Sequence, residues 1–109
     1  MVSDISSIKN TLAPVFLEKG VRRAVLFGSF AKGENTDESD VDLLVDCDLQ
    51  GFSFFAFVDE LEDVLGRDVD CFDISHIIAE SPVDREIKRT GIVIYEKTDK
   101  EILKKIKDT

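Results

Sequence analysis

Leu26-Phe27-Gly28-Ser29 is followed ten residues later by Ser39-Asp40-Val41-Asp42-Leu43-Leu44-Val45. One apolar run thus ends on Gly-Ser, and a second apolar run opens with two aspartates separated by a single residue. Side chains alternate between the two faces of a β-strand, so we expect both aspartates on the same side, about 6–7 Å apart. The pattern predicts two buried strands, the second of which begins with an acidic pair.

The acidic pair, Asp40 and Asp42, carries an electrostatic cost. Two like charges at this separation repel each other by about 3 kcal/mol at the effective dielectric constant of a protein surface. A divalent cation would remove this repulsion, and Mg²⁺ binds carboxylate oxygens together with phosphates and water. Backbone N–H groups at Gly28 and Ser29 are suited to phosphate oxygens. A metal ion together with phosphate indicates nucleotide chemistry.

Length and composition limit the class of protein. The chain has 109 residues, of which 43% are hydrophobic and 34% are charged, as is typical of one folded domain. Its net charge of −9 argues against long nucleic-acid tracts as a partner, because phosphate binding needs clustered Lys and Arg. No apolar run approaches the ~20 residues of a membrane-spanning helix. The N-terminus lacks a signal-peptide pattern, so we expect a cytoplasmic protein.

Periodicity and capping residues predict the order α-β-α-β-α-β-α-β-α, which indicates an α/β fold with helices packed on a mixed four-stranded sheet. We expect helices over residues 4–19, within 28–33, over 52–65, over 82–89 and from Thr98 onward, and strands over 21–27, 39–46, 68–72 and 92–95. Pro14 is expected to kink the first helix or to start a fresh turn within it.

The third predicted strand adds another carboxylate. In Asp68-Val69-Asp70-Cys71-Phe72, alternation places Asp68, Asp70 and Phe72 on one face. If this strand lies beside the second one, Asp70 joins Asp40 and Asp42 in a cluster. Three carboxylates can hold two divalent ions, which stabilise the attacking and leaving oxygens of a displacement at phosphorus. Asp70 is then the expected acceptor of the nucleophile's proton.

These motifs give the sequence a resemblance to a known family. Gly28-Ser29, the later Asp40-x-Asp42 and the third aspartate, Asp70, resemble the minimal nucleotidyltransferases of the DNA polymerase β superfamily. The resemblance covers most of the chain, from the first helix through Tyr95. It implies that residues 1–109 form a single nucleotidyltransferase domain with a polymerase β-like core.

The resemblance also implies roles for single residues. The nucleotide-binding residues would be Gly28, Ser29, Lys32 and Ser39, and the catalytic and Mg²⁺-binding residues would be Asp40, Asp42 and Asp70. Two positions depart from the family's pattern, because Phe30 and Lys32 stand where many relatives carry arginine. Lys32 offers a point charge in place of a guanidinium that could grip phosphate at two points.

The resemblance further implies a reaction and a partner. Such proteins transfer AMP from Mg·ATP to a hydroxyl group, and stand-alone members are commonly paired with a helical HEPN-type protein as a toxin–antitoxin module. There the nucleotidyltransferase is the antitoxin, in some cases because it adenylylates a tyrosine of the toxin. The sequence shows no room for an acceptor-binding domain, so we expect a separate protein to present the acceptor.

Two other functions stay open. The chain could be a non-catalytic antitoxin or regulatory module that neutralises its partner by occlusion. Transfer to a small molecule such as an aminoglycoside is a weaker alternative, which would need a dimer to build the second site. The sequence does not separate ATP from other nucleotides or fix the oligomeric state, so a homo-oligomer stays open.

Four other residues have competing interpretations. We expect Phe52 and Phe55 to be buried under a neighbouring loop, the alternative being an exposed apolar patch for a partner. Arg67 either contacts phosphate or has a structural role. The single histidine, His76, is expected to be incidental because no catalytic partner is identifiable.

Overall fold

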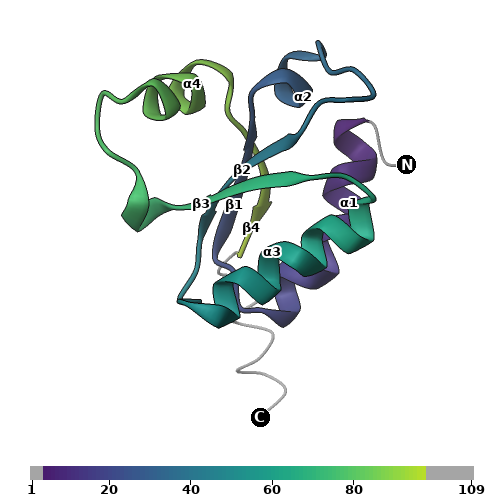
Figure 1. The fold of residues 1–109 in the computed structure, drawn as a ribbon, viewed down its shortest axis with the longest axis vertical. Helices are drawn as coiled ribbons and strands as arrows, with labels where there is room; N and C mark the ends of the chain where they lie inside the picture. The colour runs from purple at the N-terminus through teal and green to yellow at the C-terminus, as the bar shows by residue number, and fades with distance from the viewer. Residues whose placement is uncertain (1–3, 98–109) are drawn as a thin grey trace.

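A computed structural model describes residues 4–97 of the chain (Figure 1). Its elements alternate in the order α1 (Ile5–Glu18), β1 (Arg23–Phe27), α2 (Ser29–Lys32), β2 (Val41–Asp46), α3 (Phe52–Leu65), β3 (Val69–Asp73), η1 (Ile74–His76, a 3-10 helix), α4 (Pro82–Thr90) and β4 (Ile92–Glu96). The predicted α/β class is confirmed. The helix expected from Thr98 onward lies outside the described residues.

The four strands form one mixed sheet in the order β3-β2-β1-β4. β1 pairs antiparallel with both β2 and β4, whereas β2 and β3 run parallel. The chain passes from β2 to β3 through α3, because parallel neighbours need a crossover connection. The structure therefore confirms the mixed sheet and meets the condition that the third strand lies beside the second.

Helices α1 and α3 cover one face of the sheet and form the main hydrophobic core with it (Figure 1). The carboxylate of Asp4 caps α1 by accepting a hydrogen bond from the Ser7 N–H at 2.8 Å. The helix includes Pro14 without a break, so this proline does not start a fresh turn. Within residues 4–97 we find no helix with the length and apolar character needed to cross a membrane.

Helix α4 packs against β1 on the other side of the sheet (Figure 1). Its first residue is Pro82, and the hydroxyl of Ser81 accepts a hydrogen bond from the Asp84 N–H at 3.2 Å, as an N-cap does. Val25 and Phe27 of β1 are only 8% and 3% exposed. Both faces of β1 are therefore covered, which makes it the most enclosed strand of the sheet.

The second strand begins later than predicted. β2 starts at Val41, because Ser39 belongs to the preceding loop, where its N–H donates to the carbonyl of Thr36 at 3.1 Å. Asp40 consequently lies directly before the strand and not within it. The Val41 N–H then bonds to the Asp68 carbonyl at 3.0 Å, which opens the β2–β3 pairing.

The expectation that a loop buries Phe52 and Phe55 is wrong. Their exposed fractions are 94% and 68%. The buried positions of α3 are Phe57, Leu61 and Leu65, which lie four residues apart along one side of the helix. At about 100° per residue, Phe52 and Phe55 are rotated well away from that side.

Candidate active site

Asp42 and Asp70 lie side by side on neighbouring strands. They are register partners in the parallel pairing of β2 with β3, and Asp42 is also the register partner of Phe27 on β1. Register partners point to the same face of a sheet, so the three side chains form a row across the sheet. That face is opposite the one on which Val41 and Leu43 join the main core. The sheet thus brings together two aspartates that are far apart in the sequence.

The surroundings of Asp42 disfavour its charge. Burial, followed by the negative charges of Asp70, Asp40 and Glu86, raises the pKa of Asp42 to about 6. A hydrogen bond between the carboxyl groups of Asp42 and Asp70 acts in the same direction. The nearly buried ring of Phe27, next to Asp42 in the row, helps to keep water away. Since neutral pH lies above this pKa, Asp42 is mostly ionised in the metal-free site, where it lies close to the negative charges of Asp70, Asp40 and Glu86.

This donor set fits a hard divalent cation such as Mg²⁺. Among residues 4–97, no three Asp, Glu, His or Cys side chains are grouped closely enough to hold a metal ion by themselves. The predicted cluster of Asp40, Asp42 and Asp70 is therefore not assembled as a three-carboxylate metal site: Asp42 and Asp70 adjoin each other, and Asp40 is near enough to influence the pKa of Asp42. Mg²⁺ usually takes one or two carboxylates and completes its coordination with substrate phosphates and water. The arrangement suits an ion that binds together with a phosphate-bearing substrate.

Gly28 connects β1 to α2 and lies directly against Asp42. Its φ of 74° is in the left-handed region that side chains avoid. A Cβ atom at this position would also overlap Oδ2 of Asp42. Two separate constraints therefore require glycine at position 28: the backbone conformation and the close approach of the Asp42 carboxylate.

The Gly28 N–H is bonded within the protein. It donates to Oγ1 of Thr90, at the end of α4, at 2.9 Å. The Thr90 hydroxyl in turn donates to the carbonyl of Glu86 at 2.8 Å. The expectation that this N–H is available to phosphate is therefore not met, and the phosphate contact predicted for the turn falls to the half-buried Ser29.

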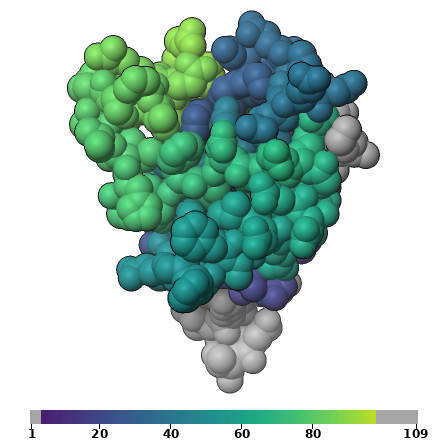
Figure 2. Space-filling model, viewed as in Figure 1, coloured from purple at the N-terminus to yellow at the C-terminus, as the bar shows by residue number. Residues whose placement is uncertain are grey.

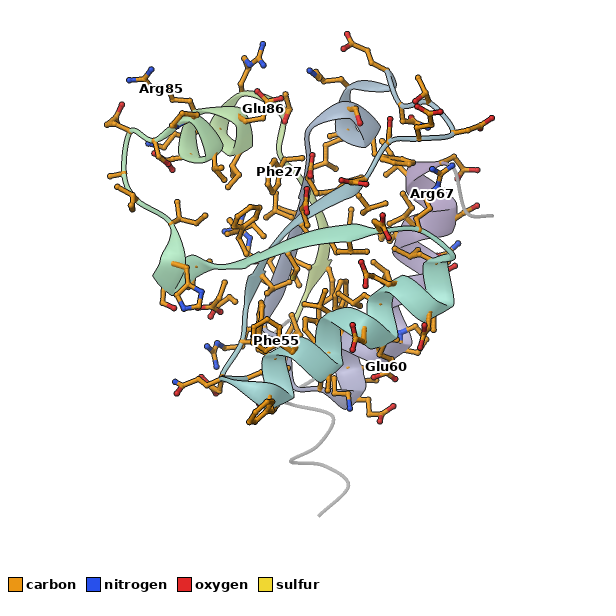
Figure 3. The ribbon with its side chains drawn as sticks, in the orientation of Figure 1. Phe27, Phe55, Glu60, Arg67, Arg85 and Glu86 are labelled. Atoms are coloured by element: carbon orange, nitrogen blue, oxygen red, sulfur yellow. The ribbon has the colours of Figure 1, made fainter. Side chains whose placement is uncertain are left out.

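Lys32, at the end of α2, is held by carboxylates. Its Nζ lies 3.5 Å from Oε1 of Glu86 and 3.6 Å from Oε2 of Glu34. Glu86 also forms an ion pair with Arg89. Figure 3 shows Glu86 at the side of α4 that faces α2. Sequence reasoning missed Glu86 and Thr90, because nothing local to α4 indicates that it packs beside a turn formed some 60 residues earlier.

Ser39 and Arg67 both stabilise the loop before β2. The Ser39 hydroxyl accepts a hydrogen bond from the Thr36 N–H at 2.8 Å. Arg67 is 9% exposed and donates to the carbonyls of Asp37 and Ser39 at 3.2 and 3.3 Å. Its guanidinium also lies 5.0 Å from the ring centre of Phe30. The structural interpretation of Arg67 is thereby supported, and Phe30 provides the ring on which its guanidinium stacks.

His76 lies away from the aspartates. It belongs to η1, which follows β3, and its ring meets that of Phe54 edge-on at 6.5 Å. Both residues line a cavity of about 450 Å³ at the carboxyl ends of β2 and β3. Asp42 and Asp70 are near the amino ends of these strands, so the cavity and the candidate active site occupy opposite ends of the sheet.

Helices α2 and α4 flank the candidate active site. In the space-filling view they form two lobes at the same end of the molecule, α4 in green and α2 in blue (Figure 2). Gly28 and Ser29 belong to the α2 segment, and Glu86 and Thr90 to α4. Asp42 lies against Gly28 and is close enough to Glu86 for the charge of that residue to raise its pKa.

Comparison with known proteins assigns this arrangement to a family. Residues 8–100 match the family described as "Polymerase beta, Nucleotidyltransferase". The chain belongs to this family. It is thus a nucleotidyltransferase.

One curated relative is a protein of Methanocaldococcus jannaschii named "Putative protein adenylyltransferase MJ0435". It is 43% identical over 70 residues, a segment that makes up 62% of this chain and 74% of the relative.

Two solved structures show the same fold. One is described as a toxin–antitoxin with AMP-PNP, with a TM-score of 0.71 and 19% identity over 91% of this chain and 82% of the other. The second is described as a tri-AMPylated Shewanella oneidensis HEPN toxin in complex with MNT antitoxin. Its TM-score is 0.66, with 16% identity over 91% of this chain and 78% of the other. At these identities the similarity establishes the fold alone.

Proposed function

We propose that this nucleotidyltransferase transfers AMP from Mg·ATP to a hydroxyl group of a partner protein, a tyrosine of a HEPN-type helical protein, and so acts as the antitoxin of a toxin–antitoxin pair. The observation that carries the proposal is the pairing of Asp42 with Asp70 in register beside the Gly28–Ser29 turn. A relative named as a protein adenylyltransferase and a fold shared with an MNT antitoxin complex support the choice of acceptor. In this proposed function residues 1–109 form one domain, which acts in the cytoplasm.

The proposed roles of the residues follow from their places in the structure. Ser29 and the Gly28 turn bind the triphosphate, with Lys32 and Ser39 at the edge of the nucleotide site. Asp40, Asp42 and Asp70 would hold Mg²⁺, two ions in the active complex, together with substrate phosphates and water, which complete the coordination. The ions would neutralise phosphate charge and stabilise the leaving oxygen.

The transfer itself is a displacement at the α-phosphorus. The acceptor's hydroxyl oxygen forms the new P–O bond, the bond from the α-phosphorus to the bridging oxygen breaks, and pyrophosphate leaves. Asp70 accepts the hydroxyl proton, because it is exposed on β3 and adjoins Asp42. Holding both reactants in line beside this base supplies the positioning part of catalysis.

The test is label transfer from α-³²P-ATP with Mg²⁺ in a lysate of the source cells. Wild type is compared with Asp40→Asn/Asp42→Asn and with Asp59→Asn/Asp63→Asn, a matched pair of exposed carboxylates on α3. We expect a protease-sensitive labelled band with wild type and with the α3 variant, and none with the site variant.

Other outcomes would redirect the proposal. An RNase-sensitive signal would make RNA the acceptor, and label in the low-molecular-mass fraction would indicate transfer to a small molecule. If no label appears while a partner co-purifies equally with wild type and the site variant, the chain is a non-catalytic binding module.

A further inference from the structure

Helix α4 is bonded to both ends of α2. At the N-terminal end, Oγ1 of Thr90 accepts the Gly28 N–H at 2.9 Å. At the C-terminal end, Glu86 forms an ion pair with Lys32, with 3.5 Å between Oε1 and Nζ. α2 has only four residues, too few for a helix to be stable by itself. Its position therefore depends on contacts from outside, and α4 supplies one at each end.

The hydrogen bonds at Thr90 run in a defined direction. A hydroxyl has one hydrogen, and that of Thr90 is donated to the Glu86 carbonyl at 2.8 Å. Its oxygen is left to accept the Gly28 N–H. Gly28 is buried, so this N–H would lack a substitute partner from bulk water if the Thr90 hydroxyl were removed.

Gly28 is also constrained by Asp42. The space that a Cβ atom would take is filled by Oδ2 of Asp42. With its N–H bonded to α4 and its Cα against the carboxylate, Gly28 has little freedom to shift. Ser29 follows it directly in the chain, so the placement of Gly28 determines where Ser29 stands relative to Asp42.

We propose that Thr90 is a positioning residue of the nucleotidyl transfer. Its hydroxyl fixes the Gly28–Ser29 turn against Asp42 and thereby sets the affinity of the site for the triphosphate. Thr90 acts through Gly28 and not on the reacting atoms. The inference rests on the proposed function, because it concerns the same site.

The test compares Thr90→Val, which keeps the branched shape without the hydroxyl, with Thr90→Ser, which keeps the hydroxyl. We expect Thr90→Val to raise both the Kd and the KM for Mg·ATP about tenfold, the size of one lost hydrogen bond, and to change kcat less than about threefold. Thr90→Ser should restore both constants to within about twofold of wild type. The Gly28 amide, followed by ¹⁵N NMR, should exchange with solvent faster in Thr90→Val alone.

A destabilised control separates positioning from stability. Leu12→Ala removes buried contacts of α1 and should lower the melting temperature without altering the Kd for Mg·ATP. If Leu12→Ala weakens ATP binding as much as Thr90→Val does, loss of stability explains the effect and the inference is wrong. It is equally wrong if Gly28 exchanges faster in Thr90→Val while Kd and KM stay unchanged.

The binding measurement also distinguishes this inference from the proposed function. If wild type binds Mg·ATP but transfers no label, the proposed function fails, and the Kd values of the Thr90 variants still decide the role of Thr90. If wild type does not bind Mg·ATP at all, both are overturned.

Discussion

Gly28 and Asp42 are packed so closely that no side chain fits at Gly28, because its Cβ would overlap Oδ2 of Asp42. The turn after β1 therefore rests on an ionisable carboxyl group of β2. Burial and neighbouring negative charges disfavour the charged form of that carboxyl group. The stability of the fold around Gly28 should therefore depend on whether Asp42 is protonated.

Gly28→Ala should destabilise the protein and reduce AMP transfer. We expect a loss of about 2 kcal/mol or more in the free energy of unfolding, because Gly28 (φ 74°, ψ −149°) has a backbone conformation almost confined to glycine and because the added Cβ overlaps Asp42. Urea denaturation measures it. Gly33→Ala is the control for a positive φ without a clash, since Gly33 lies in the left-handed helical region (φ 73°, ψ 20°) and no atom is within 4 Å of the added Cβ.

The extra cost of Gly28→Ala over Gly33→Ala should shrink in an Asp42→Ala background, because the overlapping carboxylate is then absent. An undiminished cost in that background would show that the strain does not come from Asp42.

The stability of the metal-free protein should depend on the charge of Asp42. Its folded-state pKa of about 6 exceeds the ordinary value of 3.8, so the folded protein retains a proton that the unfolded chain has lost. The stability that this bound proton gives the folded state is fully present below about pH 4, and it is lost as the pH rises through about 6. After allowance for solvent screening, Asp42→Asn should be more stable than wild type by about 1 kcal/mol at pH 7.

Urea titrations in EDTA between pH 4 and pH 7 measure this difference. The advantage of Asp42→Asn should vanish near pH 4, where the wild-type carboxyl group is protonated. An advantage that is constant with pH would contradict the linkage, since it would not come from ionisation.

Arg67→Met should loosen the loop before β2. The substitution leaves the carbonyls of Asp37 and Ser39 without this donor and removes the guanidinium from the Phe30 ring. We expect a loss of about 2–3 kcal/mol in the free energy of unfolding. Hydrogen exchange of residues 36–40 should speed up.

Arg85→Met is the control for Arg67→Met, because Arg85 is exposed on α4. It should change stability by less than about 0.5 kcal/mol. An equal change in the free energy of unfolding for the two substitutions would mean that the contacts of Arg67 with the loop and with Phe30 do not stabilise the fold.

Phe52→Ser combined with Phe55→Ser should leave thermal stability nearly unchanged, within about 0.5 kcal/mol, because both rings are largely exposed. Phe57→Ser on the same helix should cost at least about 3 kcal/mol, because that ring is fully buried. Thermal unfolding followed by circular dichroism compares them. A large loss in the Phe52/Phe55 variant would show that something covers these rings in solution.

Sequence periodicity predicted those elements whose ends carry local signals. The bounds of α3 are as predicted, because a four-residue spacing of buried side chains ends at Gly66, which caps the helix in a left-handed conformation. The start of β2 was not predicted, because Ser39 is held in a loop by local bonds to Thr36 and by a bond from Arg67, which is 28 residues away in the sequence.

The candidate site was predictable only in part, for the same reason. Alternation along strands placed Asp42 and Asp70 on suitable faces, and the sheet order then made them neighbours. The bonds of Thr90 to Gly28 and of Glu86 to Lys32 join segments more than 50 residues apart, and no spacing rule reaches across that distance.

The hydrogen bond between Gly28 and Thr90 joins residues 62 positions apart. The N-terminus of a nascent chain leaves the ribosome first. A chain that has emerged only as far as β3 therefore contains Asp42 and Asp70 but not Thr90, whose hydroxyl accepts the Gly28 N–H. Until α4 has left the exit tunnel, the turn beside these carboxylates lacks one of its supports. Truncated or stalled translation products would therefore contain Asp42 and Asp70 but would lack the hydrogen bond that fixes the Gly28–Ser29 turn.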